Sequence, residues 1–348
     1  MYRISIKTSF QAVSAIKRVL ISSSSIDAIL LAALISFTCT GFGPTAEEIS
    51  AGEQAPGVRN EAGRQAEEAL SNARNSAGLV RKEIQAGSDR IVYLEGGRGE
   101  TLLLLHGYGG SKDMWIDFAQ LLTPDYHVVI PDLAGFGEST KRSGENYNID
   151  AQVNRLDRFV QALQLERFHL AGNSMGGTIA ALYATKAPQK ISTLALLAPW
   201  GLQRAKRTDW QWRVENYGEN LLLISSPGEF ERVTQLCFVK PPPTLGPIKK
   251  LVIDQMIADR RFNEKIGWDL FKEALALESF LPMIQAPVLI IWGDHDRLLD
   301  VSGAPILEKG LKNHQTLIMK DTGHISMWEK PAETAAVYIG FLKKQRGM

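Results

Sequence analysis

The chain has 348 residues, of which 39 are Lys or Arg and 38 are Asp or Glu, giving a formal net charge of +1 and an apolar fraction of 45%. These values are typical of a globular protein, and they include no basic stripe of the kind that binds nucleic acid. We therefore expect no nucleic-acid partner. The two cysteines, Cys39 and Cys237, stand far apart in unlike settings, which predicts neither a structural disulfide nor a metal site.

Residues 1–39 have the composition of a targeting segment. Basic residues precede an apolar stretch over 28–37, and the first acidic residue is Asp27. This order predicts a signal peptide or a membrane anchor, with the basic side in the cytoplasm. The apolar stretch is shorter than the about 20 residues of a spanning helix, so both alternatives stay open. A lipoprotein site at Cys39 is a third alternative. Each predicts a membrane-anchored or exported protein, on the periplasmic or extracellular side if bacterial.

Residues 40–78 separate this segment from the folded domain that we expect over 79–348. Gly, Pro, Ala and Glu dominate residues 40–60, a composition typical of a linker. Residues 61–77 are polar and favour a helix, which we expect to lie over the folded domain.

Apolar runs typical of strands alternate with helix-prone runs in the first half of the domain. We expect strands over 79–85, 90–94, 102–105, 126–131 and 168–171, and helices over 114–122, over 149–163 and after 178. This alternation predicts an α/β fold with a mostly parallel sheet covered by helices on both faces. Asp132 follows one of these strands, and we expect it to stabilise a turn rather than take part in chemistry.

The alternation stops at about residues 200–285, where a mainly helical insertion follows the sixth core strand. Its aromatic residues are Trp200, Trp210, Trp212, Tyr217, Phe230, Phe238 and Phe262. We interpret the insertion as a lid over an apolar pocket. Most of these rings are expected to form the core of the lid itself, and a few are expected to line the pocket.

The sequence Gly172-Asn173-Ser174-Met175-Gly176-Gly177 lies between a predicted strand and a predicted helix. A G-x-S-x-G sequence in this context is typical of the nucleophile elbow of the α/β-hydrolases, a turn that strains the serine backbone and exposes its hydroxyl. The glycines let the strand and the helix approach closely. Ser174 is therefore the predicted nucleophile.

A carboxylate and a histidine follow Ser174 in the chain order of that fold. Asp296 comes after the strand-like run 287–293, and His324 comes after the run 315–319. His324 is the predicted base that takes the serine proton, and Asp296 is predicted to fix its tautomer. Asp294 and Asp300 are alternative carboxylates, the first expected to stabilise a turn and the second to cap the next helix. The G-x-x-D spacing from Gly293 favours Asp296.

The loop His106-Gly107-Tyr108-Gly109-Gly110 follows the wholly apolar strand 102–105. In this fold one oxyanion donor comes from that loop and the other from the residue after the nucleophile. The predicted oxyanion donors are therefore the backbone N–H groups of Tyr108 and Met175. We expect His106 to fix the loop through a hydrogen bond rather than to belong to the triad.

These motifs, together with Trp292–Asp296 and Leu299–Ala304, resemble those of the membrane-anchored monoacylglycerol lipases of the α/β-hydrolase superfamily and of related bacterial lipases and esterases. The likeness runs from about residue 79 to 342 and is weakest in the lid. It implies the α/β-hydrolase fold and hydrolysis of carboxylic esters with fatty acyl chains, monoacylglycerols first. It also implies a lipid or other acyl ester as the substrate and no cofactor.

Three alternative functions are weighed against this one. Carbon–carbon bond hydrolases of ring-cleavage products share the G-N-S-M-G-G sequence, but they typically place tryptophan after the catalytic histidine, where this chain has Ile325. Dehalogenases and epoxide hydrolases use an aspartate nucleophile, so Ser174 argues against both. A binding protein of this fold usually lacks a triad member. The carbon–carbon hydrolase is the second candidate.

Overall fold

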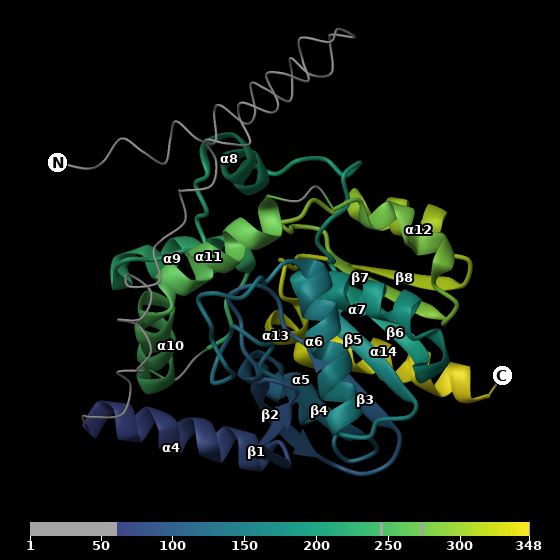
Figure 1. Ribbon diagram of the computed structural model, residues 1–348, viewed down its shortest axis with the longest axis horizontal. Coiled ribbons are helices and arrows are strands. Elements are labelled where there is room, and N and C mark those ends of the chain that lie inside the picture. Colours follow the sequence, from purple (N-terminus) through teal and green to yellow (C-terminus); the bar gives the residue numbers. More distant parts are fainter. Residues whose placement is uncertain (1–60, 244–245, 273–274, 348) are drawn as a thin grey trace, which may run out of the picture.

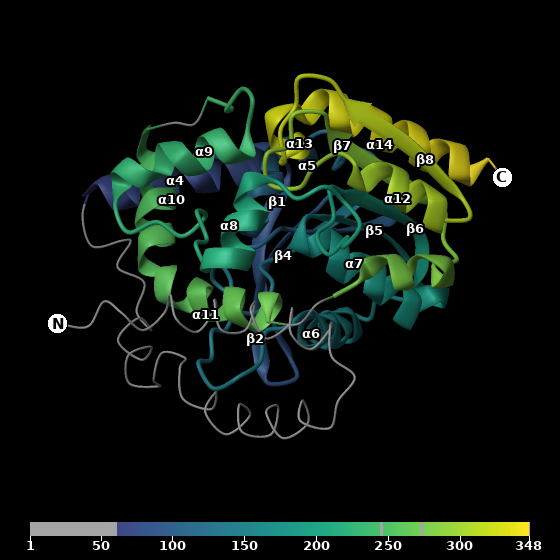
Figure 2. The same ribbon diagram turned by 90° about the horizontal axis from the view of Figure 1, so that it is seen from above.

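The computed structural model describes residues 61–243, 246–272 and 275–347. The predicted signal or anchor (1–39) and linker (40–60) lie outside the described residues. Figure 1 and Figure 2 give two views of the architecture. Within the described ranges the helices are α4 (Glu61–Ser76), α5 (Ile116–Ala119), α6 (Ile149–Ala162), α7 (Met175–Lys186), α8 (Asp209–Tyr217), α9 (Phe230–Cys237), α10 (Gly246–Ala258), α11 (Arg260–Phe271), α12 (Gly303–Gly310), α13 (Ser326–Glu329) and α14 (Pro331–Arg346).

The described strands form one eight-stranded sheet in the order β1-β2-β4-β3-β5-β6-β7-β8. Their bounds are β1 (Leu79–Ala86), β2 (Asp89–Gly96), β3 (Thr101–Leu105), β4 (His127–Pro131), β5 (Phe168–Asn173), β6 (Ile191–Leu197), β7 (Val288–Gly293) and β8 (His314–Met319). The first two strands pair antiparallel, β2 is antiparallel to β4, and all other pairs are parallel. The expected mostly parallel sheet is confirmed.

Helices cover both faces of this sheet. Figures 1 and 2 show α6, α7 and α12 on one face and α5, α13 and α14 on the other. Because neither face meets water, the central strands are mostly apolar: the Leu102–Leu105 part of β3 is fully buried, as are nearly all residues of β5 and β7. The expected helix over 114–122 is shorter, a 3-10 turn at Lys112–Trp115 followed by α5.

Parallel pairing brings the carboxyl ends of the central strands to one edge of the sheet. Leu105 pairs with Gly172, Asn173 with Leu197, and Gly293 with Met319. The loops that follow β3, β5, β7 and β8 therefore meet at that edge, where ligands bind in open parallel sheets. These loops carry Tyr108, Ser174, Asp296 and His324.

Helices α8 to α11 lie between β6 and β7 in the chain, at the predicted position of the helical insertion. Figure 1 shows them above and beside the sheet, with α10 next to α4. Helix α4, which forms where the sequence predicts a polar helix, packs on α10 and on β1. Among the described residues, no helix has both the length and the apolar composition needed to cross a membrane.

Candidate active site

Ser174 lies at the turn between β5 and α7. Its backbone is at φ 56° and ψ −121°, a conformation that non-glycine residues rarely adopt and that costs about 1–3 kcal/mol. The flanking glycines permit the turn. A Cβ on Gly172 would lie 2.3 Å from the carbonyl oxygen of Gly176, and one on Gly176 would lie 2.4 Å from that of His106. The strained elbow expected from the sequence is therefore present.

Asp296 and His324 are joined in the fold although 28 residues separate them in the chain. The Nδ1 atom of His324 is 2.7 Å from Oδ2 of Asp296, and both side chains are almost fully buried. The other carboxylate oxygen, Oδ1, accepts the backbone N–H groups of Leu298 and Leu299, each at 2.9 Å. With both oxygens occupied, the carboxylate has one orientation, and Nδ1 of His324 is the proton donor.

The other two carboxylates make different contacts. Asp294 lies 2.6 Å from Nδ1 of His295 and accepts the N–H of Thr322. Asp300 accepts the N–H of Ser302 at the turn before α12. Of the three carboxylates that the sequence offers, Asp296 is the one that contacts His324.

The histidine loop is tied to the end of β5. The side-chain amide of Asn173, the residue before Ser174, donates to the backbone carbonyl of His324 at 3.1 Å and to that of Leu197 at 3.2 Å. This buried amide links the serine turn, the end of β6 and the histidine loop. The sequence predicts no role for Asn173.

The loop over residues 106–111, called the oxyanion loop below after the role that the sequence predicts for it, lies against Ser174. A Cβ on Gly107 would lie 3.1 Å from Cβ of Ser174. His106 fixes the start of the loop: its Nε2 accepts the N–H of Leu133 at 2.9 Å, so its Nδ1 carries the proton and donates to the carbonyl of Gly107 at 2.8 Å. Burial lowers the pKa of His106, which agrees with this neutral tautomer. The structural role expected of His106 is confirmed.

Tyr108 connects the oxyanion loop to the helical insertion. Its hydroxyl donates to the carbonyl of Asn263 in α11 at 2.5 Å and accepts the side-chain amide of Asn220 at 3.3 Å. Burial raises the pKa of Tyr108, so this phenol remains a protonated donor. Gly267 of α11 leaves room for the contact, since a Cβ there would lie 3.1 Å from the tyrosine hydroxyl.

An aromatic cluster adjoins these residues. Phe271 at the end of α11 contacts the rings of Tyr108, Trp200 and Trp210, with ring centroids 5.7–6.1 Å apart. The backbone N–H of Trp200 donates to the carbonyl of Ser174 at 3.2 Å, so the cluster reaches the serine turn. Trp210 and Phe262 are buried as core residues of the insertion, but Trp212 and Tyr217 are 45% and 40% exposed and pack edge to face on its surface. Phe271 is absent from the sequence-based candidates.

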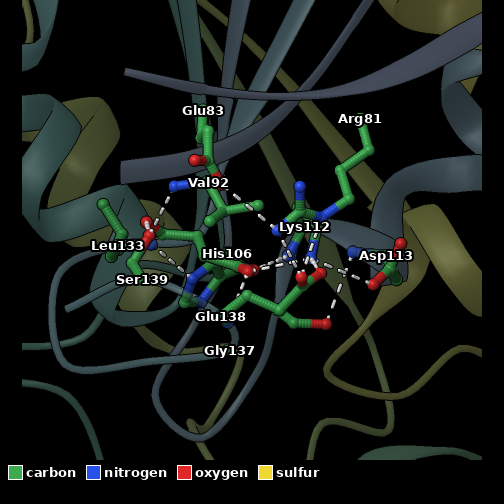
Figure 3. A network of polar contacts seen from close by, with 12 residues as sticks. Arg81, Glu83, Val92, His106, Lys112, Asp113, Leu133, Gly137, Glu138 and Ser139 are labelled. Carbon is green, nitrogen blue, oxygen red and sulfur yellow. Dashed lines mark hydrogen bonds and ion pairs between the residues drawn. The ribbon is translucent and has the colours of Figure 1, made fainter. Parts of the chain in front are cut away.

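A network of charged residues lies beside the oxyanion loop (Figure 3). The ammonium group of Lys112 contacts Asp132 at 2.8 Å and Glu138 at 2.7 Å, and Asp132 also accepts the backbone N–H groups of Lys112 and Glu138. Burial alone would lower the pKa of Lys112, but the neighbouring carboxylates raise it, so the lysine stays charged. The turn-stabilising role expected of Asp132 is confirmed.

A second group of contacts joins the histidine loop to the insertion. The carboxylate of Glu329 accepts the N–H groups of Val239 and Lys240 through Oε1 and that of Gly323 through Oε2. The N–H of His324 donates to the carbonyl of Cys237 at 2.8 Å. Burial raises the pKa of the Cys237 thiol to about 12, which makes it an apolar core residue. In the described part of the chain, no group of three His, Cys, Asp or Glu side chains could hold a metal ion.

The comparison with known proteins agrees with this architecture. A family model described as the alpha/beta hydrolase fold matches residues 100–331. Monoacylglycerol lipase ABHD6 of Homo sapiens is 34% identical over 256 residues, which cover 71% of this chain and 76% of that protein. Lipase 1 of Psychrobacter immobilis is 34% identical over 275 residues, which cover 77% of this chain and 86% of that protein.

Among solved structures, a membrane phospholipase A titled a bacterial virulence factor is 36% identical. It superimposes with a TM-score of 0.81 and covers 93% of this chain and 100% of its own. The family match and the extent of these alignments lead to one conclusion: the chain belongs to the α/β-hydrolase family.

Proposed function

We propose that this protein is a serine hydrolase that cleaves carboxylic esters of fatty acyl chains, monoacylglycerols first, with Ser174 as nucleophile, His324 as base and Asp296 as orienting carboxylate. The observation that carries the proposal is the buried hydrogen bond between Nδ1 of His324 and Asp296, at the sheet edge where Ser174 occupies its strained turn. With Nδ1 donating to Asp296, the lone pair of Nε2 is free to take the serine proton.

The proposed reaction has two stages. The Ser174 oxygen attacks the ester carbonyl as its proton passes to Nε2 of His324, and the imidazolium then protonates the leaving alcohol as the C–O bond breaks. In the second stage water attacks the acyl-enzyme carbonyl as the same imidazole takes its proton, and the imidazolium returns this proton to the Ser174 oxygen as the fatty acid leaves. Asp296 stabilises the imidazolium in both stages.

The oxyanion of each tetrahedral intermediate is assigned to the N–H groups of Tyr108 and Met175. Met175 is the first residue of α7, and N–H groups in the first helical turn have no partner within the helix. The contact of Gly107 with Ser174 brings the oxyanion loop to the same point. A single such donor stabilises the transition state by about 2.7–4 kcal/mol.

The fatty acyl part of the substrate is assigned to the partly buried rings of Tyr108, Trp200 and Phe271, which adjoin Ser174 and offer apolar contact. We propose that the insertion over residues 200–285 acts as the lid of this site. The relatives named as monoacylglycerol lipase, lipase and phospholipase A share ester chemistry on acyl lipids. The carbon–carbon hydrolase alternative is not favoured, since these relatives are ester hydrolases and Ile325 follows His324.

We further propose that the protein is membrane-anchored or exported through residues 1–39, with the catalytic domain over 79–348. The basic and apolar order of the N-terminal sequence supports this location.

The test is a substrate panel on the full-length protein with Ser174→Ala as control. The panel compares p-nitrophenyl esters of short and long chain, a monoacylglycerol and a dienoic ring-cleavage product. We expect serine-dependent turnover of the esters and the monoacylglycerol, with activity lowered by several orders of magnitude in a folded Ser174→Ala variant. Turnover of the dienoic compound alone, or activity retained without Ser174, would overturn the proposal.

A further inference from the structure

The charged network beside the oxyanion loop contains groups that the proposed reaction does not use. Lys112 is 2% exposed at its side chain and Asp132 is fully buried, and both lie next to a loop whose position decides where one oxyanion donor points. Burying charged groups costs free energy unless they are paired and hydrogen-bonded, so the contacts of Lys112 and Asp132 indicate a structural role.

Hydrogen bonds fix the oxyanion loop at both ends to Asp132 and Leu133, the two residues that follow β4. His106 holds its start through the N–H of Leu133. Lys112 holds its end, because its backbone N–H and its ammonium group both donate to the carboxylate of Asp132. Figure 3 shows His106 beside Leu133, and Lys112 between Asp113 and Glu138.

A third attachment comes from α4. Arg74, in the last turn of that helix, donates from Nε and Nη2 to the two carboxylate oxygens of Asp113, each at 2.7 Å. The arginine side chain is 9% exposed and the carboxylate 19%, so water screens the pair little. A bidentate pair of this kind fixes direction as well as distance.

We infer that Arg74 of α4 is a positioning residue for the oxyanion loop, acting through Asp113; this inference rests on the proposed function. The reason is the competition for Lys112. The carboxylate of Asp113 lies 3.5 Å from the lysine ammonium, which binds Asp132 and Glu138 more closely. Without Arg74, Asp113 moves closer to Lys112, with which it already forms this 3.5 Å ion pair, and the segment that ends the oxyanion loop shifts with it.

Helix α4 therefore helps to position the oxyanion loop although it precedes the first strand of the sheet. It precedes β1 in the chain, and Arg74 in its last turn contacts Asp113, in the 3-10 turn that directly follows the oxyanion loop. The position of the Tyr108 N–H group consequently depends on whether α4 is docked.

The test compares Arg74→Ala and Arg74→Lys in the full-length protein, with Arg64→Ala as the matched control. Arg64 lies on the same helix and pairs with Glu61 on the exposed side. Reactive serines are counted with a fluorophosphonate, and kcat per reactive serine, KM and the inhibition constant of a long-chain trifluoromethyl ketone are measured. The ketone forms a tetrahedral adduct, so its affinity reports the oxyanion donors.

We expect Arg74→Ala to lower kcat per reactive serine by about tenfold while KM stays unchanged, because a small displacement of a catalytic donor is costly. The ketone inhibition constant rises by the same factor, Arg74→Lys recovers part of the loss, and Arg64→Ala has no effect. In a double-mutant cycle, we expect Arg74→Ala to cause little further loss of kcat per reactive serine when Asp113→Asn is already present.

Two results would overturn the inference: a lower count of reactive serines with unchanged kcat and ketone affinity per serine, or equal losses in Arg64→Ala. A failure of the proposed function is distinguishable from both. In that case wild-type protein binds neither reagent, and activity is independent of Ser174.

Discussion

At the scale of single residues, the site depends on hydrogen bonds that leave each group one role. Asp296 has both oxygens engaged, one by His324 and the other by two backbone N–H groups. His106 is restricted in a comparable way by Leu133 and Gly107 and is neutral. Two buried histidines thus follow two strands of one sheet, and their partners decide which of them has a free ring nitrogen at the proposed site.

Replacing the proposed orienting carboxylate separates the candidate acids. Asp296→Asn preserves shape but favours the wrong imidazole tautomer, so we expect kcat to fall by about 10⁴-fold with little change in KM. Asp294→Asn serves as the matched control, because Asp294 contacts His295 and Thr322 and is expected to matter little. Steady-state kinetics on a p-nitrophenyl ester decides the point. Equal losses in the two variants would remove Asp296 from the assignment.

At the scale of elements, the end of α9 and the histidine loop act as one unit. Glu329 accepts three backbone N–H groups, two from residues 239–240 of the insertion and one from Gly323. Arg297, next to Asp296, donates to the carbonyl of Gln235 in α9 at 2.8 Å. A displacement of α9 therefore affects Asp296 through its neighbour Arg297, and His324 through its neighbour Gly323.

Removing the Glu329 carboxylate should loosen this unit. We expect Glu329→Ala to lower kcat by about tenfold, because Gly323, the residue before His324, loses the hydrogen bond from its N–H to this carboxylate. We expect a smaller loss in Glu329→Gln, whose amide oxygen still accepts from one side. Glu333→Ala, at an exposed position of α14, is the control. Hydrogen exchange at residues 237–240 and 323–324 should rise in Glu329→Ala, and unchanged exchange with unchanged kcat would contradict the role.

Prediction from the sequence succeeds where the information is local. The apolar strands, the elbow at Ser174 and the turn role of Asp132 each follow from a short stretch of residues. The pairing of Arg74 with Asp113 joins residues 39 apart, and Glu329 lies 90 residues from Val239. Charged residues are solvated in most proteins, so nothing in either stretch marks these residues as partners in the fold. The sequence does not single out Phe271 either, because an aromatic residue in a helix usually belongs to a core.

At the scale of the whole molecule, the charged network ties α4, β1 and the loops after β3 and β4 together. Glu138 lies at its centre, contacting Arg81 of β1 and Lys112. Burial would raise the pKa of Glu138, but the hydrogen bond from Arg81 and the charge of Lys112 outweigh it and lower the pKa to about 2. The folded state therefore holds the charged form more strongly than the unfolded chain does.

This depressed pKa makes part of the stability pH-dependent. Its contribution is fully present above the ordinary glutamate value of 4.5 and is lost as the pH falls towards about 2. We expect the difference in unfolding free energy between wild type and Glu138→Gln to shrink over that range. Urea titrations of both proteins at about pH 6, 4 and 3 measure this difference in unfolding free energy. A difference that stays constant with pH would exclude this carboxylate as the source.

The role of Ser174 is tested by covalent labelling of the full-length protein with a long-chain alkyl fluorophosphonate, followed by peptide mass mapping and ester hydrolysis assays. We predict one adduct, on the peptide at Ser174, with esterase activity lost in proportion to labelling and with protection by a monoacylglycerol. Activity that survives complete labelling of Ser174, or inactivation through an adduct elsewhere, would contradict this role.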